Sequence, residues 1–144
     1  MGQLQQYKDH FILFVEAGFI AVNQLDEDAA LKLFRAAELL KPETTLPKVG
    51  VGYLHLCKLE LKKACQCFEE VLAKEPNNDM AKTFLGLSLS LSPKELKKGE
   101  DMLEEMSKKS QDPGIKKLSQ TAIDFVDRFV KKGGAPMQQK ATKK

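Results

Sequence analysis

The sequence predicts an all-α fold made of repeated helical hairpins. Two observations predict it: a pattern that recurs every 34 residues, and apolar residues spaced three and four apart within each repeat. The recurring pattern is a small residue, a phenylalanine four positions later and a proline eight positions after that: Ala30, Phe34 and Pro42, then Ala64, Phe68 and Pro76. Upstream of these segments, three glycines keep the same spacing: Gly18, Gly52 and Gly86.

A 34-residue period with Gly, Ala, Phe and Pro at fixed offsets is typical of the tetratricopeptide repeat, a helix–turn–helix unit. Counted from Phe11, three repeats are predicted at 11–44, 45–78 and 79–112. A helix over 113–132 is predicted to cap the last repeat, because a solenoid needs a terminal element with a polar outer side. We therefore expect one helical domain over 1–132 that winds as a right-handed superhelix, followed by a disordered basic tail over 133–144.

Capping and helix-breaking residues predict where the helices begin and end. Asp26 follows the first predicted helix as an N-cap, and Pro42 stops the second. Thr44 or Thr45 and Asn78 are predicted caps of the third and fifth helices. The run Ser92-Pro93-Lys94-Glu95 matches a capping box with proline at the first helical position.

The last repeat departs from the 34-residue register by one residue. Gly99 and Leu103 come one position later than the earlier repeats predict, which a single insertion in the preceding turn explains. After Asp112 and Pro113, the capping helix carries one predicted apolar stripe for packing: Ile115, Leu118, Ala122, Phe125, Val126 and Phe129.

The composition is that of an ordinary globular chain, with 42% hydrophobic and 30% charged residues. The net charge of +3 lies largely in lysines of the last fourteen residues, and the two arginines, Arg35 and Arg128, are too few for a phosphate-reading surface. The longest apolar run, Phe11 to Val22, is too short to span a bilayer and lacks the features of a secretory signal. We expect a cytoplasmic protein that binds neither nucleic acid nor a membrane.

No pattern in the sequence predicts catalysis. A phosphate-binding glycine loop, a metal-ligand cluster and a nucleophile beside a base are all missing, so we expect neither an enzyme nor a cofactor or metal. The three cysteines, Cys57, Cys65 and Cys67, have no disulfide or metal spacing and are interpreted as small buried apolar residues.

The predicted functional surface is a groove. In tetratricopeptide proteins the first helix of each repeat lines a concave channel, and the register assigns apolar residues to it. The predicted groove residues are Ile12, Val15, Phe19, Val22, Leu46, Val49, Tyr53, Leu56, Met80, Thr83 and Leu87. Apolar residues also occupy the positions that hold Lys, Asn and Arg in carboxylate-binding members of the family, which excludes that mode. An apolar channel suits an amphipathic helix with anchors at helical spacing.

The first predicted helix is apolar on nearly every face, which is expected of a helix that is buried on every face. Since no repeat precedes it, we expect a further partner, or a second copy of the chain, to cover its outer side.

A short chain of about three such repeats with an apolar groove and a closing helix resembles the chaperones of bacterial type III secretion, above all those of the needle subunit. The resemblance implies that the groove shields a helix of the needle subunit and prevents premature polymerisation. It also implies a small helical co-chaperone and hence a hetero-oligomer. The implied co-chaperone contacts are Leu4, Tyr7, Phe11 and Phe14.

Two alternatives stay open. One is a chaperone of hydrophobic translocator proteins, which differs only in its cargo. The other is a general repeat adaptor that binds a folded partner through its charged convex side, where Glu69, Glu70 and Lys74 lie.

Overall fold

The computed structural model describes Tyr7 and residues 10–132. The described residues form α-helices joined by short turns and contain no strand, so the predicted all-α fold is confirmed. The chain divides into two compact units, Met1–Asn78 and Asp79–Lys144, at the predicted border between the second and third repeats. Leu4 and the predicted disordered tail over 133–144 lie outside the described residues.

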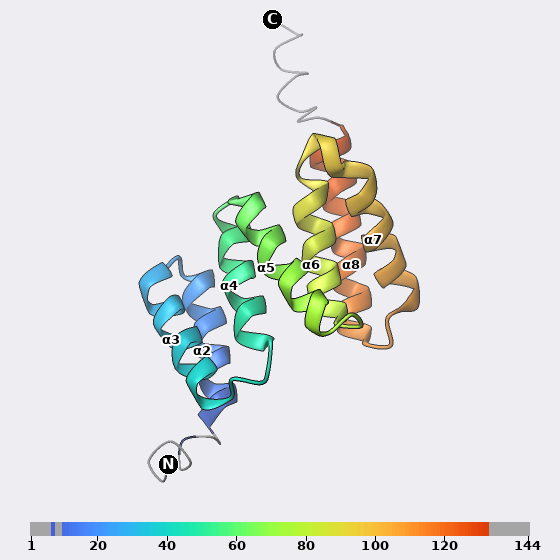
Figure 1. The fold of residues 1–144 in the computed structure, drawn as a ribbon. Helices are drawn as coiled ribbons and strands as arrows, with labels where there is room; N and C mark the ends of the chain where they lie inside the picture. Colours follow the sequence, from blue (N-terminus) through green and yellow to red (C-terminus); the bar gives the residue numbers. More distant parts are fainter. Residues whose placement is uncertain (1–6, 8–9, 133–144) are drawn as a thin grey trace, which may run out of the picture. The chain divides into compact units, whose positions relative to one another are not determined.

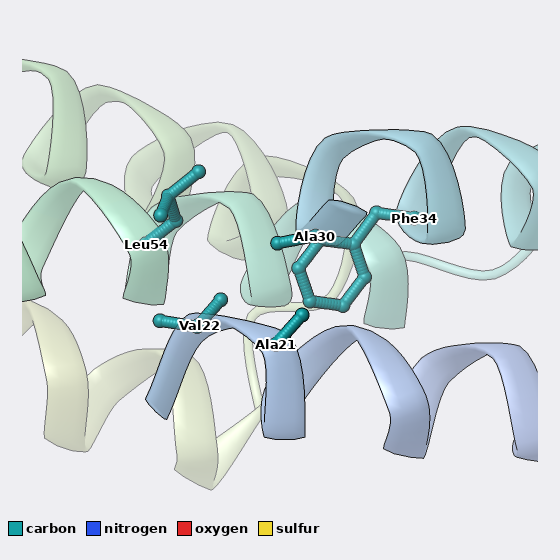
Figure 2. Close-up of a cluster of buried hydrophobic side chains, with 5 residues drawn as sticks. All are labelled: Ala21, Val22, Ala30, Phe34 and Leu54. Atoms are coloured by element: carbon teal, nitrogen blue, oxygen red, sulfur yellow. The ribbon is translucent and has the colours of Figure 1, made fainter. Parts of the chain in front are cut away.

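The first unit contains two helical hairpins. Helices α2 (Phe11–Asn23) and α3 (Glu27–Leu40) form one, and α4 (Leu46–Cys57) and α5 (Leu61–Lys74) form the other. Helix α4 packs against both α2 and α3, so the hairpins share a core (Figure 1). Figure 2 shows part of that core, with Phe34 and Ala30 from α3, Ala21 and Val22 from α2, and Leu54 from α4.

The repeating glycines and phenylalanines meet inside this unit. A Cβ atom built on Gly18 would lie 2.5 Å from Cε1 of Phe34, and one on Gly50 would lie 2.3 Å from the same atom. A Cβ on Gly52 would similarly lie 2.6 Å from Cε1 of Phe68. Since real Cβ atoms do not approach so closely, only glycine leaves room for these fully buried rings.

The second unit is a third hairpin with an added helix. Helices α6 (Asp79–Ser90) and α7 (Leu96–Lys109) pack together, and α8 (Pro113–Phe125) packs on both (Figure 1). Gly86 of α6 faces Leu103 of α7, where the earlier hairpins place glycine against phenylalanine. A Cβ on Gly86 would lie 3.1 Å from Cγ of Leu103 and 3.2 Å from Cβ of Met102, so the one-residue shift stays a prediction.

Helix boundaries agree closely with the capping residues. The Asp26 carboxylate accepts a hydrogen bond from the Ala29 N–H at 3.0 Å and caps α3. At the start of α4, Thr44 Oγ1 accepts from the Leu46 N–H at 3.3 Å, whereas the Thr45 side chain makes no cap bond there. The Thr45 hydroxyl instead donates to Glu75 Oε2 at 2.8 Å.

The predicted capping box at Ser92 is wrong. Pro93–Glu95 forms a separate 3₁₀ turn, in which the Glu95 N–H donates to the Ser92 carbonyl, and α7 begins only at Leu96. Because this turn breaks the path into α7, the Ser92 side chain does not cap the helix.

The C-terminal helix differs from its predicted packing. Beyond α8 it continues as the π-helix η3 (Val126–Lys131), whose wider turns rotate later residues away from the α-helical stripe. Ile115, Ala122 and Val126 are buried as predicted, and Phe129 in η3 is 52% exposed. Phe125 is 44% exposed for another reason: it still lies in α8, beside the side of the helix that is buried.

Candidate partner-binding surface

Helix α2 presents an apolar side to solvent. We call Ile12, Leu13, Glu16 and Ile20 the α2 face; its three apolar residues are 51%, 59% and 56% exposed. Glu16 is the only charged residue among the 13 residues of α2. Soluble proteins rarely expose contiguous apolar surface, so the α2 face is a candidate binding surface.

Beside this face, two aromatic rings connect α2 with α4. Phe19 and Tyr53 are half-buried, and their ring centroids lie 5.6 Å apart. The Tyr53 hydroxyl donates a hydrogen bond to Asn23 Oδ1 at 2.7 Å, which fixes the ring at the surface. Burial raises the pKa of Tyr53, with the nearby Cys57 thiol adding to the shift, so the phenol stays protonated as a donor at neutral pH.

Several predicted groove residues belong to the core instead. Their side chains are at most 6% exposed and leave almost no surface for a partner: Val15, Val22, Val49, Leu56 and Thr83. The physical reason is that the first helix of a hairpin packs on its own second helix and on neighbouring elements, which uses most of its apolar circumference. Ile12, Phe19, Leu46 and Tyr53 remain accessible in the first unit.

In the second unit, Met80 is exposed and Leu87 is half-buried against the cluster of Leu103, Ala122 and Val126. The Thr83 hydroxyl donates to the Asp79 carbonyl at 2.8 Å and lies 3.3 Å from the Ser119 hydroxyl. It is thus satisfied inside the unit.

The predicted co-chaperone residues fall into different environments. Phe11 is 4% exposed and packs with Val15, Ala37 and Leu40, so its assignment to a contact surface is wrong. Tyr7 and Phe14 line a shallow apolar hollow of about 270 Å³, which we call the N-terminal hollow. Its other lining residues are Ala36, Leu39 and Leu40.

Three accessible residues lie outside the binding residues predicted one by one from the sequence, although two of them belong to the apolar first helix whose outer side we expect a partner to cover. Leu13 and Ile20 belong to the α2 face, and Leu39 beside the N-terminal hollow is 69% exposed. Spacing could have identified Ile20, because it follows Ile12 and Glu16 at intervals of four along one side of the helix.

A more polar hollow lies on the α3–α5 side of the first unit. It has a volume of about 410 Å³, and Glu38, Lys48, Glu70 and Lys74 are among its lining residues. Lys48 forms an ion pair with Glu70, and this hydrogen bond holds the pKa of the Glu70 carboxyl below its usual value.

The residues that could bind a metal ion lie apart from one another in the described part of the chain. Within Tyr7 and residues 10–132, no three His, Cys, Asp or Glu side chains gather as a metal site. Cys65 and Cys67 are half-buried, but Cys57 is exposed, so the prediction of a buried residue is wrong there. No helix in the described part of the chain has the length and apolar content to cross a bilayer.

Comparison of the chain with protein-family models, with curated proteins and with solved structures finds no match.

Proposed function

We propose that this chain is a non-catalytic binding protein that shields an apolar helix of a partner protein. The observation that carries the proposal is the accessible pair of rings, Phe19 and Tyr53, which lies beside the exposed α2 face. An amphipathic helix could bury this surface with anchors at helical spacing. Leaving the surface in water costs about 25 cal/mol for each Å² of apolar area.

The resemblance to type III secretion chaperones specifies the proposal. In that setting the chain has a tetratricopeptide-repeat fold and acts in the bacterial cytoplasm as one part of a hetero-oligomer. A helix of the needle subunit lies against Phe19 and Tyr53, and its release needs no chemical step. A translocator protein is the alternative cargo for the same surface.

A second contact would cover the outer side of α2. A small helical co-chaperone is proposed to pack on the α2 face and to fill the N-terminal hollow beside Tyr7 and Phe14. Glu16 sets a condition on that partner, because a carboxylate buried without a counter-charge is costly. The partner must therefore bring a lysine or arginine to Glu16 or leave this residue at the rim.

Purification of the chain from its native host, with mass-spectrometric identification of what accompanies it, tests the proposal. Two small helical proteins in one complex are expected, one of which self-assembles when purified alone. The variant Ile12→Asp/Ile20→Asp should lose the protein on the α2 face. A chain that purifies alone, and stays a soluble monomer by light scattering, would contradict the proposal.

One observation favours a second function. The hollow of about 410 Å³ is lined by Glu70 and Lys74, two of the residues predicted for an adaptor that binds a folded partner by its convex side. For an adaptor, Glu70→Lys/Lys74→Glu would abolish capture, and changes to Tyr53 would not.

A further inference from the structure

The C-terminal helix carries an aromatic pair that the packing does not use. The rings of Phe125 and Phe129 lie 5.1 Å apart, between centroids, and form one apolar ridge on the solvent side of the helix. The core of the second unit instead takes Ala122 and Val126 from the same helix. We call Phe125 and Phe129, together with the cations described next, the α8 patch.

Cations accompany both rings. Arg128 follows Phe125 by three residues, and Lys132 follows Phe129 by three. Both are exposed, and neither forms an ion pair with any described residue, whereas Lys131 is paired with Glu100 and Asp127. Asp124 lies nearby, but its carboxylate accepts a hydrogen bond from Gln120 at 3.3 Å.

The backbone marks the same place. From Val126 to Lys131 the backbone is π-helical, so the α-helical hydrogen-bond spacing of four residues widens to five around Phe129. Short π segments are rare and are frequent at functional sites. Exposed aromatic side chains beside arginine are also the composition of binding hot spots.

We propose that the α8 patch binds an acidic amphipathic helix of a partner protein. The two rings supply an apolar ridge one helical turn long, which fits between side chains of a facing helix. Carboxylates flanking the apolar side of that helix would pair with Arg128 and Lys132. The patch belongs to the second unit, so the inference stands without the function proposed for the α2 face.

Charge and shape favour a helix over a lipid surface. Ile115, Ser119, Ala122 and Val126 commit the opposite side of the helix to the core, so only a narrow ridge is free to enter a membrane. A helix can place its carboxylates beside Arg128 and Lys132 and away from Asp124, whereas a surface of anionic headgroups would face all three.

The probe is a fluorescein-labelled helical peptide with leucines along one side and glutamates on both flanks, and its twin carries lysines in place of the glutamates. Anisotropy titration of the full chain should show tighter binding of the glutamate peptide, which weakens as salt is added. Amide NMR shifts on binding should centre on residues 121–132.

Two variants of the chain locate the binding. Phe125→Ala/Phe129→Ala should weaken binding of the glutamate peptide by about tenfold or more, as loss of aromatic anchors does. Leu59→Ala removes a similarly exposed apolar group outside the α2 face and the α8 patch, and should leave the affinity unchanged.

Four results would overturn the proposal. In the first, both peptides bind residues 121–132 with equal affinity. In the second, both variants of the chain lose the same amount of affinity for the glutamate peptide. In the third, the chain binds vesicles of phosphatidylglycerol and phosphatidylcholine through the two phenylalanines but does not bind the peptide. In the fourth, the chain is a dimer that Phe125→Ala/Phe129→Ala converts to a monomer.

Discussion

The buried ring of Phe34 allows a sharp test of the packing in the first unit. Gly18 of α2 and Gly50 of α4 both contact it, and a Cβ on Gly50 would lie 2.3 Å from Cε1 and from Cζ of the ring. The ring is 0% exposed and cannot turn out to solvent without opening the core. The variant Gly50→Ala therefore has two opposing effects on stability: alanine is the better helix former, but its Cβ atom overpacks the core against Phe34.

The two effects differ in sign. Alanine in place of a mid-helix glycine stabilises by about 1 kcal/mol, whereas an extra buried carbon in a filled core costs about 1–3 kcal/mol. Gly50→Ala is thus expected to leave the free energy of unfolding unchanged or to lower it by up to about 2 kcal/mol. In a Phe34→Leu background the space is free, and the same substitution should stabilise.

Urea unfolding followed by far-UV circular dichroism measures this double-mutant cycle. We expect a coupling energy of at least about 1 kcal/mol between positions 34 and 50. If Gly50→Ala alone stabilised the chain by about 1 kcal/mol, the ring of Phe34 would not pack against the backbone of Gly50.

Three further predictions concern local features of the fold. Thr45 and Asn78 hydrogen-bond the Glu75 carboxylate and lower its pKa, so this contribution is complete above the ordinary glutamate pKa of about 4.3 and is lost as pH falls through the lowered folded-state pKa. Glu75→Gln should therefore destabilise the chain at pH 7, and the difference from the parent chain should shrink as the pH is lowered below about 4.3 in a series of urea unfolding curves. Leu25 has a φ of 64°, so Leu25→Ile should lower the thermal midpoint more than Leu25→Ala does, because a β-branched residue fits the left-handed region worst. Asp112 accepts from the Gly114 N–H at 2.7 Å, so Asp112→Ala should cost about 1 kcal/mol in urea unfolding.

Each of these has its own contradicting result. A Glu75→Gln effect that is the same at every pH of the series would show that the carboxylate charge is irrelevant. Equal midpoints for the two Leu25 variants would place that residue outside the left-handed region. Asp124→Ala, an exposed change within α8, is the control for Asp112→Ala, and equal losses would remove the capping explanation.

Much of the local structure follows from the sequence because its causes are local. Asp26 caps α3 through a single hydrogen bond from the nearby Ala29 N–H, so the local sequence suffices to predict where this helix begins. The 34-residue period likewise singles out Gly18, Gly52, Phe34 and Phe68, and the structure then brings them together in two glycine–phenylalanine pairs. At Ser92 the same reasoning failed, because the Pro93–Glu95 turn closes by its own backbone hydrogen bond before α7 begins.

Exposure was harder to predict than secondary structure. The register identifies the apolar residues of α2 and α4, but packing decides which of them are covered. Val15 and Val49 are buried in the core, whereas the side chain of Ile12 is exposed to solvent. Phe129 was missed for a different reason, since its exposure depends on a π-helical segment that no spacing rule in the sequence announces.

Partner capture by a Tyr53→Asp variant tests the central proposal most directly. Its ring lies 5.6 Å from that of Phe19, so a carboxylate there would place an unpaired charge under the bound helix. We expect Tyr53→Asp to keep its helical circular dichroism and to lose the partner in a pull-down. Tyr53→Phe, which lacks the hydroxyl and its hydrogen bond to Asn23, should retain the partner. Undiminished capture by Tyr53→Asp would contradict the proposal that this surface holds the partner helix.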